Sequence, residues 1–510
     1  MNYKCISFFL FLTLPALAGK YTAVDSLDKN LRHVQIANQV LGMSVVVVIG
    51  DSVVFNKGYG TADLGRNIAV TESTIYRIAS ISKSVTATAL MQLYEQGRFA
   101  LDDDISTAMG YQVRNPRFPN DKVTFKQLLT HTSSIIDGST YNSFLSASYS
   151  GSIPKISEIL LAGGRYYGSG ACWGNYKPGT QFEYANLGFG IIGTLVEKLS
   201  GQRFDEFCWQ HILQPLGMTA SFNVLDLPNF DNIAVLYRRQ GSQWIAQTDD
   251  YKGVRPAPRD LSIYQMGDNG IIFGPQGGLR TSAADLSKFM RAHMSGGSFA
   301  GACILQDTTV ARMHQQHWSG YAMGGFYKKK GLGLHITDDL IPGQTLIGHA
   351  GEAYGLLSDM YFDQAKRYGM IFIMNGGDQT FTSGVFYAVE EAVFRAAHTI
   401  LVQDFLLTVD EREIAWPGNG RLDQNYPNPF NASTHLNYSI LHPAHVRLII
   451  VNTLGQIIFT LDDGMKNAGF YQASWHGLDE WGRPASSGVY FYQLVIGDQV
   501  SAMKKMILIR

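Results

Sequence analysis

The chain has 510 residues, a length that corresponds to about three domains or to one large enzyme domain with a small companion. Charged residues make up 16% of it and hydrophobic residues 45%, which excludes intrinsic disorder and a long solvated coiled coil. Because 41 basic residues stand against 42 acidic ones, no global field favours nucleic acid or an anionic membrane, and a small neutral substrate is the default partner.

The first eighteen residues have the pattern of a secretory signal peptide. Lys4 precedes an apolar run that continues to Leu17, and Ala16-Leu17-Ala18 supplies the small residues of a cleavage site. The run is too short for a stable membrane anchor. We therefore expect residues 1–18 to be removed and the remaining protein to be secreted.

The cysteine count limits disulfide formation. Cys5 leaves with the signal peptide, and the three remaining cysteines allow at most one bridge: Cys172, Cys208 and Cys303. No Cys-x-x-Cys pair occurs, and none of the 13 histidines has His-Glu-x-x-His spacing. We therefore assign no metal and expect no cofactor.

A helix and a β-hairpin are the first predicted elements of the mature chain. Leu27 and Leu31 begin a helical repeat over residues 26–38, with charged residues on the other side. Residues 43–49 and 52–59 then form two strands around a Gly-Asp turn. The first strand is apolar enough to be buried on both faces.

The motif Ser-x-x-Lys follows, and its context decides its meaning, because it begins at four positions: Ser26, Ser80, Ser152 and Ser501. In a strand, residues i and i+3 point to opposite faces, which excludes Ser501. Ser152 has a proline within its motif and Ser26 opens a helix with other charges, so both are interpreted as solvated surface. The helix after Ser80 differs, because Lys83 is its only charge before Glu95.

A helix without a charged face is buried all round, and Lys83 is therefore predicted to be buried with it. A buried amine is costly unless it is paired or its pKa falls toward neutrality. The i, i+3 spacing sets this amine beside the Ser80 hydroxyl, and the helix N-terminus adds positive potential where an oxyanion would form. Ser80 and Lys83 are thus candidates for a nucleophile and its base, with a capping serine beside a snorkelling lysine as the structural alternative.

A second candidate segment runs from Lys177 to Asn186. A Pro-Gly turn leads to Tyr184 and Asn186 just before a predicted helix over 187–201. A tyrosine that faces a buried lysine is held as phenolate or shares its proton, and can act first on the serine and later on the leaving group.

Three further strands are predicted over 344–348, 354–362 and 368–375, followed by a long helix over 382–404. Together with the first hairpin they predict an α+β fold, in which a five-stranded antiparallel sheet is flanked by helices. The segment from about 80 to 330 is then a helix-rich insertion. Gly348-His349-Ala350-Gly351 lies at the end of a predicted strand, where small residues let a substrate reach the strand's backbone N–H groups.

The Ser80 motif, the Tyr184 segment and the His349 motif occur in this order along the chain. With them, residues 25–400 resemble the serine β-lactamase and penicillin-binding family of the class C, D,D-carboxypeptidase and family VIII esterase type. Three further sequence segments support the resemblance: 128–133, 275–286 and 331–334. The third motif begins with histidine, which resembles D,D-peptidases and related hydrolases. Efficient class C β-lactamases have lysine at this position. No Gly-x-Ser-x-Gly is present, so an α/β-hydrolase is not supported.

The resemblance implies a role for each candidate residue. Ser80 would be the acylated nucleophile, with Lys83 and Tyr184 as its acid/base pair. Asn186 would donate a hydrogen bond to the substrate carbonyl, and His349 and Gly351 would belong to the third motif of the substrate-binding site. The backbone N–H groups of Glu352 and Ser80 would together form the oxyanion hole.

Composition changes again after a proline- and glycine-rich stretch, which predicts a linker over 406–420 and a β-sandwich over 421–510. Its predicted strands are short and alternating: 436–440, 446–452, 456–461, 470–475, 489–496 and 503–509. The sandwich resembles the C-terminal sorting domains of type IX secretion, which share a FlgD-like immunoglobulin fold, on Asn425-Tyr-Pro-Asn-Pro-Phe-Asn431 and Ser487-Gly-Val-Tyr-Phe-Tyr-Gln-Leu494. The resemblance implies the outer-membrane secretion machinery as a partner. A spacer or carbohydrate-binding sandwich is the alternative.

The catalytic segment, residues 19–405, is thus expected to be a serine hydrolase that forms an acyl-enzyme on Ser80 with an ester, a small amide or a D-amino-acid peptide. It would act outside the cell or at the cell surface, after transit through the periplasm. One alternative is a D,D-carboxypeptidase or β-lactamase that acts on peptidoglycan peptides or β-lactams. Another is a non-catalytic penicillin-binding-like module.

Overall fold

The computed structural model describes residues 14–365, 367–403, 420–422, 424–425, 427–440, 443–467, 469–497 and 499–509. Most of the predicted signal peptide, residues 1–13, and the predicted linker up to residue 419 lie outside the described residues. The chain divides into two compact units, Met1–Gln403 and Asp404–Arg510.

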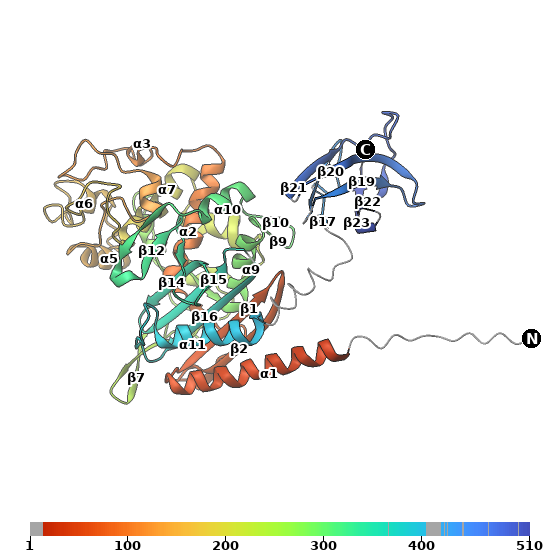
Figure 1. Ribbon diagram of the computed structural model, residues 1–510. Helices are drawn as coiled ribbons and strands as arrows, with labels where there is room; N and C mark the ends of the chain where they lie inside the picture. The colour runs from red at the N-terminus through yellow and green to blue at the C-terminus, as the bar shows by residue number, and fades with distance from the viewer. Residues whose placement is uncertain are drawn as a thin grey trace, which may run out of the picture. The chain divides into compact units, whose positions relative to one another are not determined.

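The first unit is built on one antiparallel sheet of nine strands, in the order β11-β12-β13-β14-β15-β16-β1-β2-β3 (Figure 1). Its strands are β1 (Gly42–Ile49), β2 (Ser52–Asp63), β3 (Ile68–Ala69), β11 (Trp318–Ala322), β12 (Tyr327–Lys330), β13 (His335–Thr337), β14 (Leu346–Ala353), β15 (Leu356–Asp363) and β16 (Tyr368–Gly376). The α+β class is confirmed. The five predicted strands form the contiguous middle of the sheet, and four strands extend its edges.

The central strands owe their position to their apolar sequences. All eight residues of β1 are buried, and β1 pairs with both β16 and β2, as its apolar run predicts. The added strands β3, β11, β12 and β13 are short, so they show no long apolar alternation in the sequence. The His349 motif lies inside β14 and not at the end of a strand.

Helices cover both faces of this sheet. On one face α1 (Leu14–Ala37) packs against α11 (Ala388–Ala397), which a π-helical turn η6 (His398–Val402) extends (Figure 1). On the other face, α9 (Ala283–Met294) packs on β16 and β1. The last helix begins at Ala388, later than predicted, because the Glu390 side chain accepts a hydrogen bond from the backbone N–H of Tyr387.

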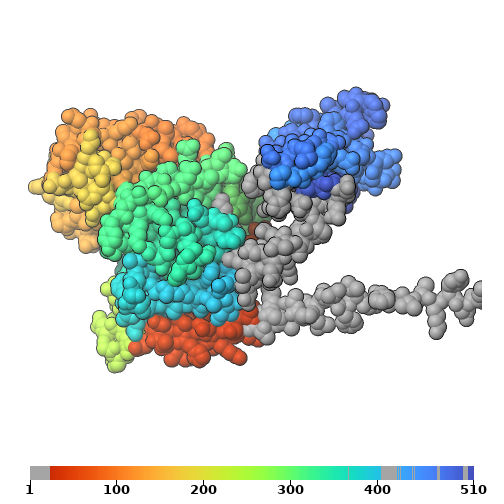
Figure 2. All heavy atoms as spheres, in the orientation of Figure 1, coloured from red at the N-terminus to blue at the C-terminus, as the bar shows by residue number. Residues whose placement is uncertain are grey.

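The predicted insertion is mostly helical but also holds short strands. Its orange and yellow residues gather in one lobe in the space-filling view, while its yellow-green hairpin lies apart from that lobe (Figure 2). Its helices and turns are η1 (Ala79–Ile81), α2 (Ser82–Glu95), α3 (Ile105–Met109), α4 (Phe125–Leu129), α5 (Tyr141–Tyr149), α6 (Ser157–Leu160), α7 (Asn186–Ser200), α8 (Phe204–Cys208), η2 (Trp209–Leu213), η3 (Val224–Asp226), η4 (Gly270–Phe273), α10 (Asp307–His314) and η5 (Met323–Gly325). Its strands form a sheet β4-β8-β5 and the hairpins β6-β7 and β9-β10, over Ile75–Arg77, Arg280–Ser282, Ala220–Ser221, Leu236–Gln240, Gln243–Thr248, Ser298–Phe299 and Ala302–Cys303.

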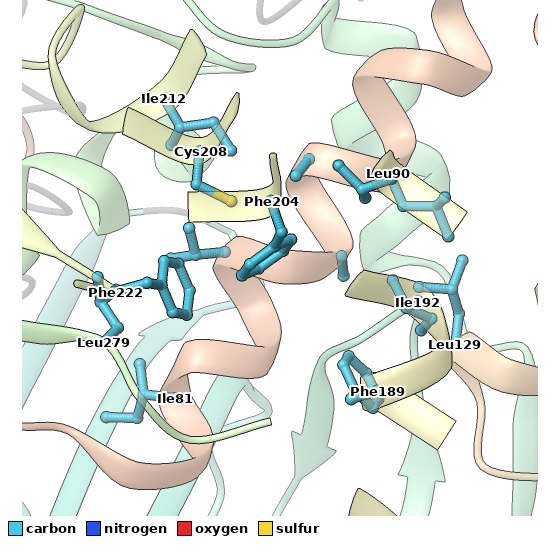
Figure 3. Close-up of a cluster of buried hydrophobic side chains, with 14 of the residues drawn as sticks. Ile81, Leu90, Leu129, Phe189, Ile192, Phe204, Cys208, Ile212, Phe222 and Leu279 are labelled. Carbon is cyan, nitrogen blue, oxygen red and sulfur yellow. The ribbon is translucent and has the colours of Figure 1, made fainter. Parts of the chain in front are cut away.

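Helix α2 runs through the centre of this unit. Figure 3 shows Leu90 of α2, and Ile81 just before the helix, among buried side chains from α7 and α8, including Ile192 and Phe204. Burial of such a side chain contributes roughly 1.5–3 kcal/mol. The predicted burial of α2 on all sides is confirmed, and Lys83 is 0% exposed.

The second unit contains two antiparallel sheets, β17-β18-β21 and β20-β19-β22-β23. Their strands are β17 (Gly420–Leu422), β18 (Thr434–Ile440), β19 (Ala444–Val451), β20 (Ile457–Lys466), β21 (Gly469–Trp475), β22 (Gly488–Ile496) and β23 (Gln499–Leu508). Both sheets contribute to one buried cluster, with Leu436 and Trp475 from the first and Leu448 and Tyr492 from the second. The six predicted strands are all present, and β17 is an addition.

Candidate active site

Ser80 lies in the 3-10 turn η1 that leads into α2. The residue before it, Ala79, has a φ of 45°, in the left-handed region that residues other than glycine rarely adopt. The start of α2, just after this turn, is tied to the segment before β8: Ser82 accepts a hydrogen bond from the backbone N–H of Leu279 at 3.1 Å, and Thr86 donates to the carbonyl of Pro275 at 2.7 Å. The nucleophile candidate is thus held on a rigid corner.

The Lys83 amine contacts three acceptors. Its Nζ lies 3.0 Å from Ser80 Oγ, 2.8 Å from Asn186 Oδ1 and 2.7 Å from the Gln276 carbonyl oxygen. Burial lowers the pKa of Lys83 to about 7, against the opposing effect of the Asp137 charge. As a neutral amine it has two hydrogens for Asn186 and Gln276 and a lone pair for the Ser80 proton. This geometry suits a general base for the serine.

Tyr184 lies beside this amine. The centroid of its ring is 4.8 Å from Lys83 Nζ, and the ring stacks on His131 at 4.4 Å and on Tyr327 at 5.5 Å. Burial raises the pKa of Tyr184 above its usual value, although hydrogen bonding with Ser80 and Tyr327 opposes this shift. Of the two states considered for this tyrosine, the neutral phenol that shares its proton is therefore favoured over the phenolate.

Asn186 is the first residue of α7 and links two groups. Its Oδ1 accepts from Lys83, while its Nδ2 donates to Asp137 Oδ2 at 2.8 Å. One N–H of the amide group therefore remains for a substrate carbonyl. The structure thus brings Ser80, Lys83, Tyr184 and Asn186 together as the sequence predicted.

The ring of His349 is fully buried, and both of its nitrogens have partners within the protein. Nδ1 lies 2.6 Å from the Ala350 carbonyl oxygen, so it carries the hydrogen, and Nε2 lies 3.4 Å from Lys330 Nζ. Burial and the neighbouring lysines lower the pKa of His349 well below its usual value. The structure therefore places His349 as a neutral support for the site, 6.4 Å from Tyr184 between ring centroids.

Gly351 brings β14 against the nucleophile turn. A Cβ at this position would lie 2.6 Å from the Ile78 carbonyl oxygen and 3.0 Å from the Ser80 nitrogen, so only glycine allows this approach. The backbone of Glu352, the next residue, thereby comes to the same corner as that of Ser80. The Glu352 side chain is exposed and accepts a hydrogen bond from the Tyr387 hydroxyl at 3.1 Å.

Four residues of this site were given no role from the sequence, although the first and third lie in segments that support the family resemblance: His131, Asp137, Gln276 and Lys330. Lys330 ends a run of three lysines, and the other two pair with Asp338 and Asp339 as a solvated face would. Lys330 alone turns inward and is fully buried, and burial lowers its pKa well below the usual value. Strand alternation does not predict this burial, because Lys328 lies on the same face of β12 and is exposed, so the sequence shows only a charge run.

The remaining thiols and the possible metal ligands add little chemistry. Cys172, Cys208 and Cys303 are all free, the first two buried and the third exposed. Across the described residues, no group of three or more His, Cys, Asp or Glu side chains is placed to hold a metal ion. Within the same residues, no helix combines the length and apolar character needed to cross a membrane.

This chain is similar in sequence to known proteins, mainly over its first unit. The family model named Beta-lactamase matches residues 27–393. Protein flp of Staphylococcus aureus strain N315 is 26% identical over 227 residues, which cover 44% of this chain and 44% of that protein, so the match spans less than half of the relative's length.

Two solved structures share the fold. The octameric penicillin-binding protein homologue of Pyrococcus abyssi has 20% identity and a TM-score of 0.56, and the match covers 95% of this chain and 99% of that one. D-amino acid amidase from Ochrobactrum anthropi SV3 has 22% identity and a TM-score of 0.56, with 75% and 99% covered. At these identities the likeness concerns the fold alone. The Beta-lactamase family model matches well over half of this chain. The chain therefore belongs to the beta-lactamase family and is a serine hydrolase of that family.

Proposed function

We propose that this protein is a secreted serine hydrolase that forms an acyl-enzyme on Ser80 with an ester, a small amide or a D-amino-acid peptide. The observation that carries the proposal is the 3.0 Å contact between Ser80 Oγ and a fully buried lysine whose pKa is about 7. Such an amine is half deprotonated at neutral pH and needs no further group to accept the serine proton.

The proposed reaction has two halves. Lys83 takes the Ser80 proton while Oγ attacks the substrate carbonyl, and the backbone N–H groups of Ser80 and Glu352 stabilise the oxyanion. Tyr184 passes the proton from Lys83 to the leaving group as the bond to that group breaks. Water then attacks the acyl-enzyme, and Lys83 and Tyr184 accept the proton of the water. They return this proton to Ser80 Oγ as the acid product leaves.

A D,D-carboxypeptidase or β-lactamase that acts on peptidoglycan peptides or β-lactams is the second candidate. Histidine at position 349, where efficient class C β-lactamases have lysine, favours the peptidase over the β-lactamase, and its neutral ring contacts Lys330. This candidate uses the same acyl-Ser80 chemistry. A non-catalytic binding module is the third, and the intact Ser80, Lys83 and Tyr184 arrangement speaks against it.

We also propose that the second unit serves export. Its two sheets and single buried cluster suit the immunoglobulin-like fold of the type IX sorting domains that its sequence resembles. The outer-membrane secretion machinery would then be its partner, and the protein would act outside the cell or at its surface. A fusion protein that lacks β22 and β23 is expected to stay in the periplasm, and unchanged export of that fusion would contradict the proposal.

Substrate profiling tests the enzymatic proposal. Purified protein is assayed with short-chain p-nitrophenyl esters, D-Ala-D-Ala peptides and nitrocefin, next to the Ser80→Ala variant. We expect turnover of an ester or a D-amino-acid peptide that the variant loses. Equal turnover by the variant, or no turnover and no covalent label from a fluorophosphonate or a penicillin, would contradict the hydrolase proposal.

A further inference from the structure

Asp137 lies in the loop between α4 and α5 and makes three close contacts with the start of α7. Its Oδ2 accepts from the backbone N–H of Asn186 at 2.9 Å and from Asn186 Nδ2 at 2.8 Å. Its Oδ1 accepts from the backbone N–H of Leu187 at 2.8 Å. Helix α7 has alanine at its N-cap position, Ala185, which offers no side-chain acceptor. Asp137 therefore caps this helix from a distant part of the chain.

The same carboxylate determines how the Asn186 amide is turned. The two polar atoms of an amide lie on opposite sides of its carbon, so the bond from Nδ2 to Asp137 directs Oδ1 to the Lys83 amine at 2.8 Å. A reversed amide would set its oxygen against the carboxylate, acceptor against acceptor, and its NH₂ group against the lysine. Only the observed orientation satisfies both neighbours.

We propose that Asp137 is a positioning residue of the active site, which caps α7 and thereby holds the Asn186 amide with its oxygen on Lys83 and its second N–H toward the substrate carbonyl. The inference rests on the proposed acylation of Ser80. It adds a residue to that mechanism that touches neither the substrate bond nor the nucleophile.

Asp137 also supplies the negative charge that acts on Lys83. The other titratable groups around Lys83 come from β12, β14 and the segments before α5 and α7, and burial favours the uncharged form of each: Lys330, His349, His131 and Tyr184. The Asp137 charge raises the pKa of Lys83 against the effect of burial. Without this charge the amine would lose its proton at a lower pH.

Two substitutions separate position from charge. Asp137→Asn removes the charge and leaves one acceptor for three donors, while Asp137→Glu keeps the charge and displaces the carboxylate. Because misplacement of about 1 Å costs on the order of 10²-fold in rate, we expect kcat/KM to fall by about that factor in both variants. We expect the acid limb of the kcat/KM profile to move to lower pH, by up to about one unit, in Asp137→Asn alone.

The matched control is Asp104→Asn. Asp104 caps α3 by accepting from the backbone N–H of Ser106 at 2.9 Å, and it also pairs with Arg114, away from the Lys83 amine. This control is expected to lower the thermal midpoint without changing kcat/KM or its pH profile. If Asp137→Asn keeps the wild-type rate, or if Asp104→Asn loses as much activity, the positioning role is wrong.

Crystal structures of the wild type and of Asp137→Asn decide the inference without reference to activity. We expect Asn186 Oδ1 to leave Lys83 in the variant, and an unchanged contact would overturn the positioning role. Failure of the proposed function is recognised separately, because the wild type would then take up no covalent label at Ser80.

Discussion

At the scale of single residues, the proposed chemistry depends on an amine that the fold buries completely. Lys83 was predictable because it is the only charged residue of its helix before Glu95, and the structure buries it completely. Lys330 was not predictable, since it follows two lysines that are paired on the surface. The contacts of Asp137 were also hidden, because its partners at Asn186 and Leu187 lie about fifty residues away in the sequence.

Replacement of the base is the first prediction at this scale. Lys83→Ala is expected to slow acylation of Ser80 by roughly 10²–10⁴-fold, the usual effect of removing a general base. The measurement is the second-order rate of labelling by a fluorophosphonate at pH 8. A rate within a few-fold of the wild type would mean that another group accepts the serine proton.

The same lysine is expected to cost stability. Its pKa is about 7 in the folded protein and about 10.4 in an unfolded chain, so the unfolded state binds the extra proton between these values. The penalty, on the order of 4 kcal/mol, is full below about pH 7 and is lost as the pH rises toward 10. Lys83→Met should therefore have a higher thermal midpoint than the wild type at pH 7, with a gap that narrows by pH 10. A gap that stays constant with pH would show that the amine titrates normally.

At the scale of elements, the sequence predicted the long strands and missed the short ones. The largely apolar runs of β1, β15 and β16 are a strong signal, whereas β11, β12 and β13 depend on pairing with neighbours in the sheet for their conformation. The approach of β14 to the nucleophile turn likewise depends on tertiary contacts between distant parts of the chain. Gly351 marks it in the sequence, but the distance to Ser80 does not follow from the motif.

This approach gives a prediction for β14. In Gly351→Ala the new methyl group would meet the Ile78 carbonyl oxygen and the Ser80 nitrogen, so the strand must move away from the corner where the oxyanion forms. We expect acylation to slow by about 10²-fold or more, as when one oxyanion donor is lost. Gly65→Ala is the control, because its Cβ would meet only Asp63 Oδ1, at an ordinary 3.4 Å. Equal rates for wild type and Gly351→Ala would mean that this close approach is not needed.

At the scale of the whole molecule, the chain consists of two units with separate cores. The proposed catalytic residues and every contact described for them lie in the first unit. A fragment of residues 19–403 is therefore expected to fold and to retain the kcat/KM of the full chain, while it loses export. A large loss of kcat/KM in a fragment with a cooperative thermal transition would show that the second unit contributes to catalysis.

The central claim is that a neutral Lys83 activates Ser80, and the pH dependence of labelling tests it most directly. The wild type is labelled with a fluorophosphonate between pH 5 and pH 9, and the modified residue is located by peptide mass spectrometry. Because the amine must be deprotonated to accept a proton, the rate at Ser80 should rise with pH and level off above an apparent pKa near 7. A rate that does not change across this range, or a label that is found on another residue, would contradict the account.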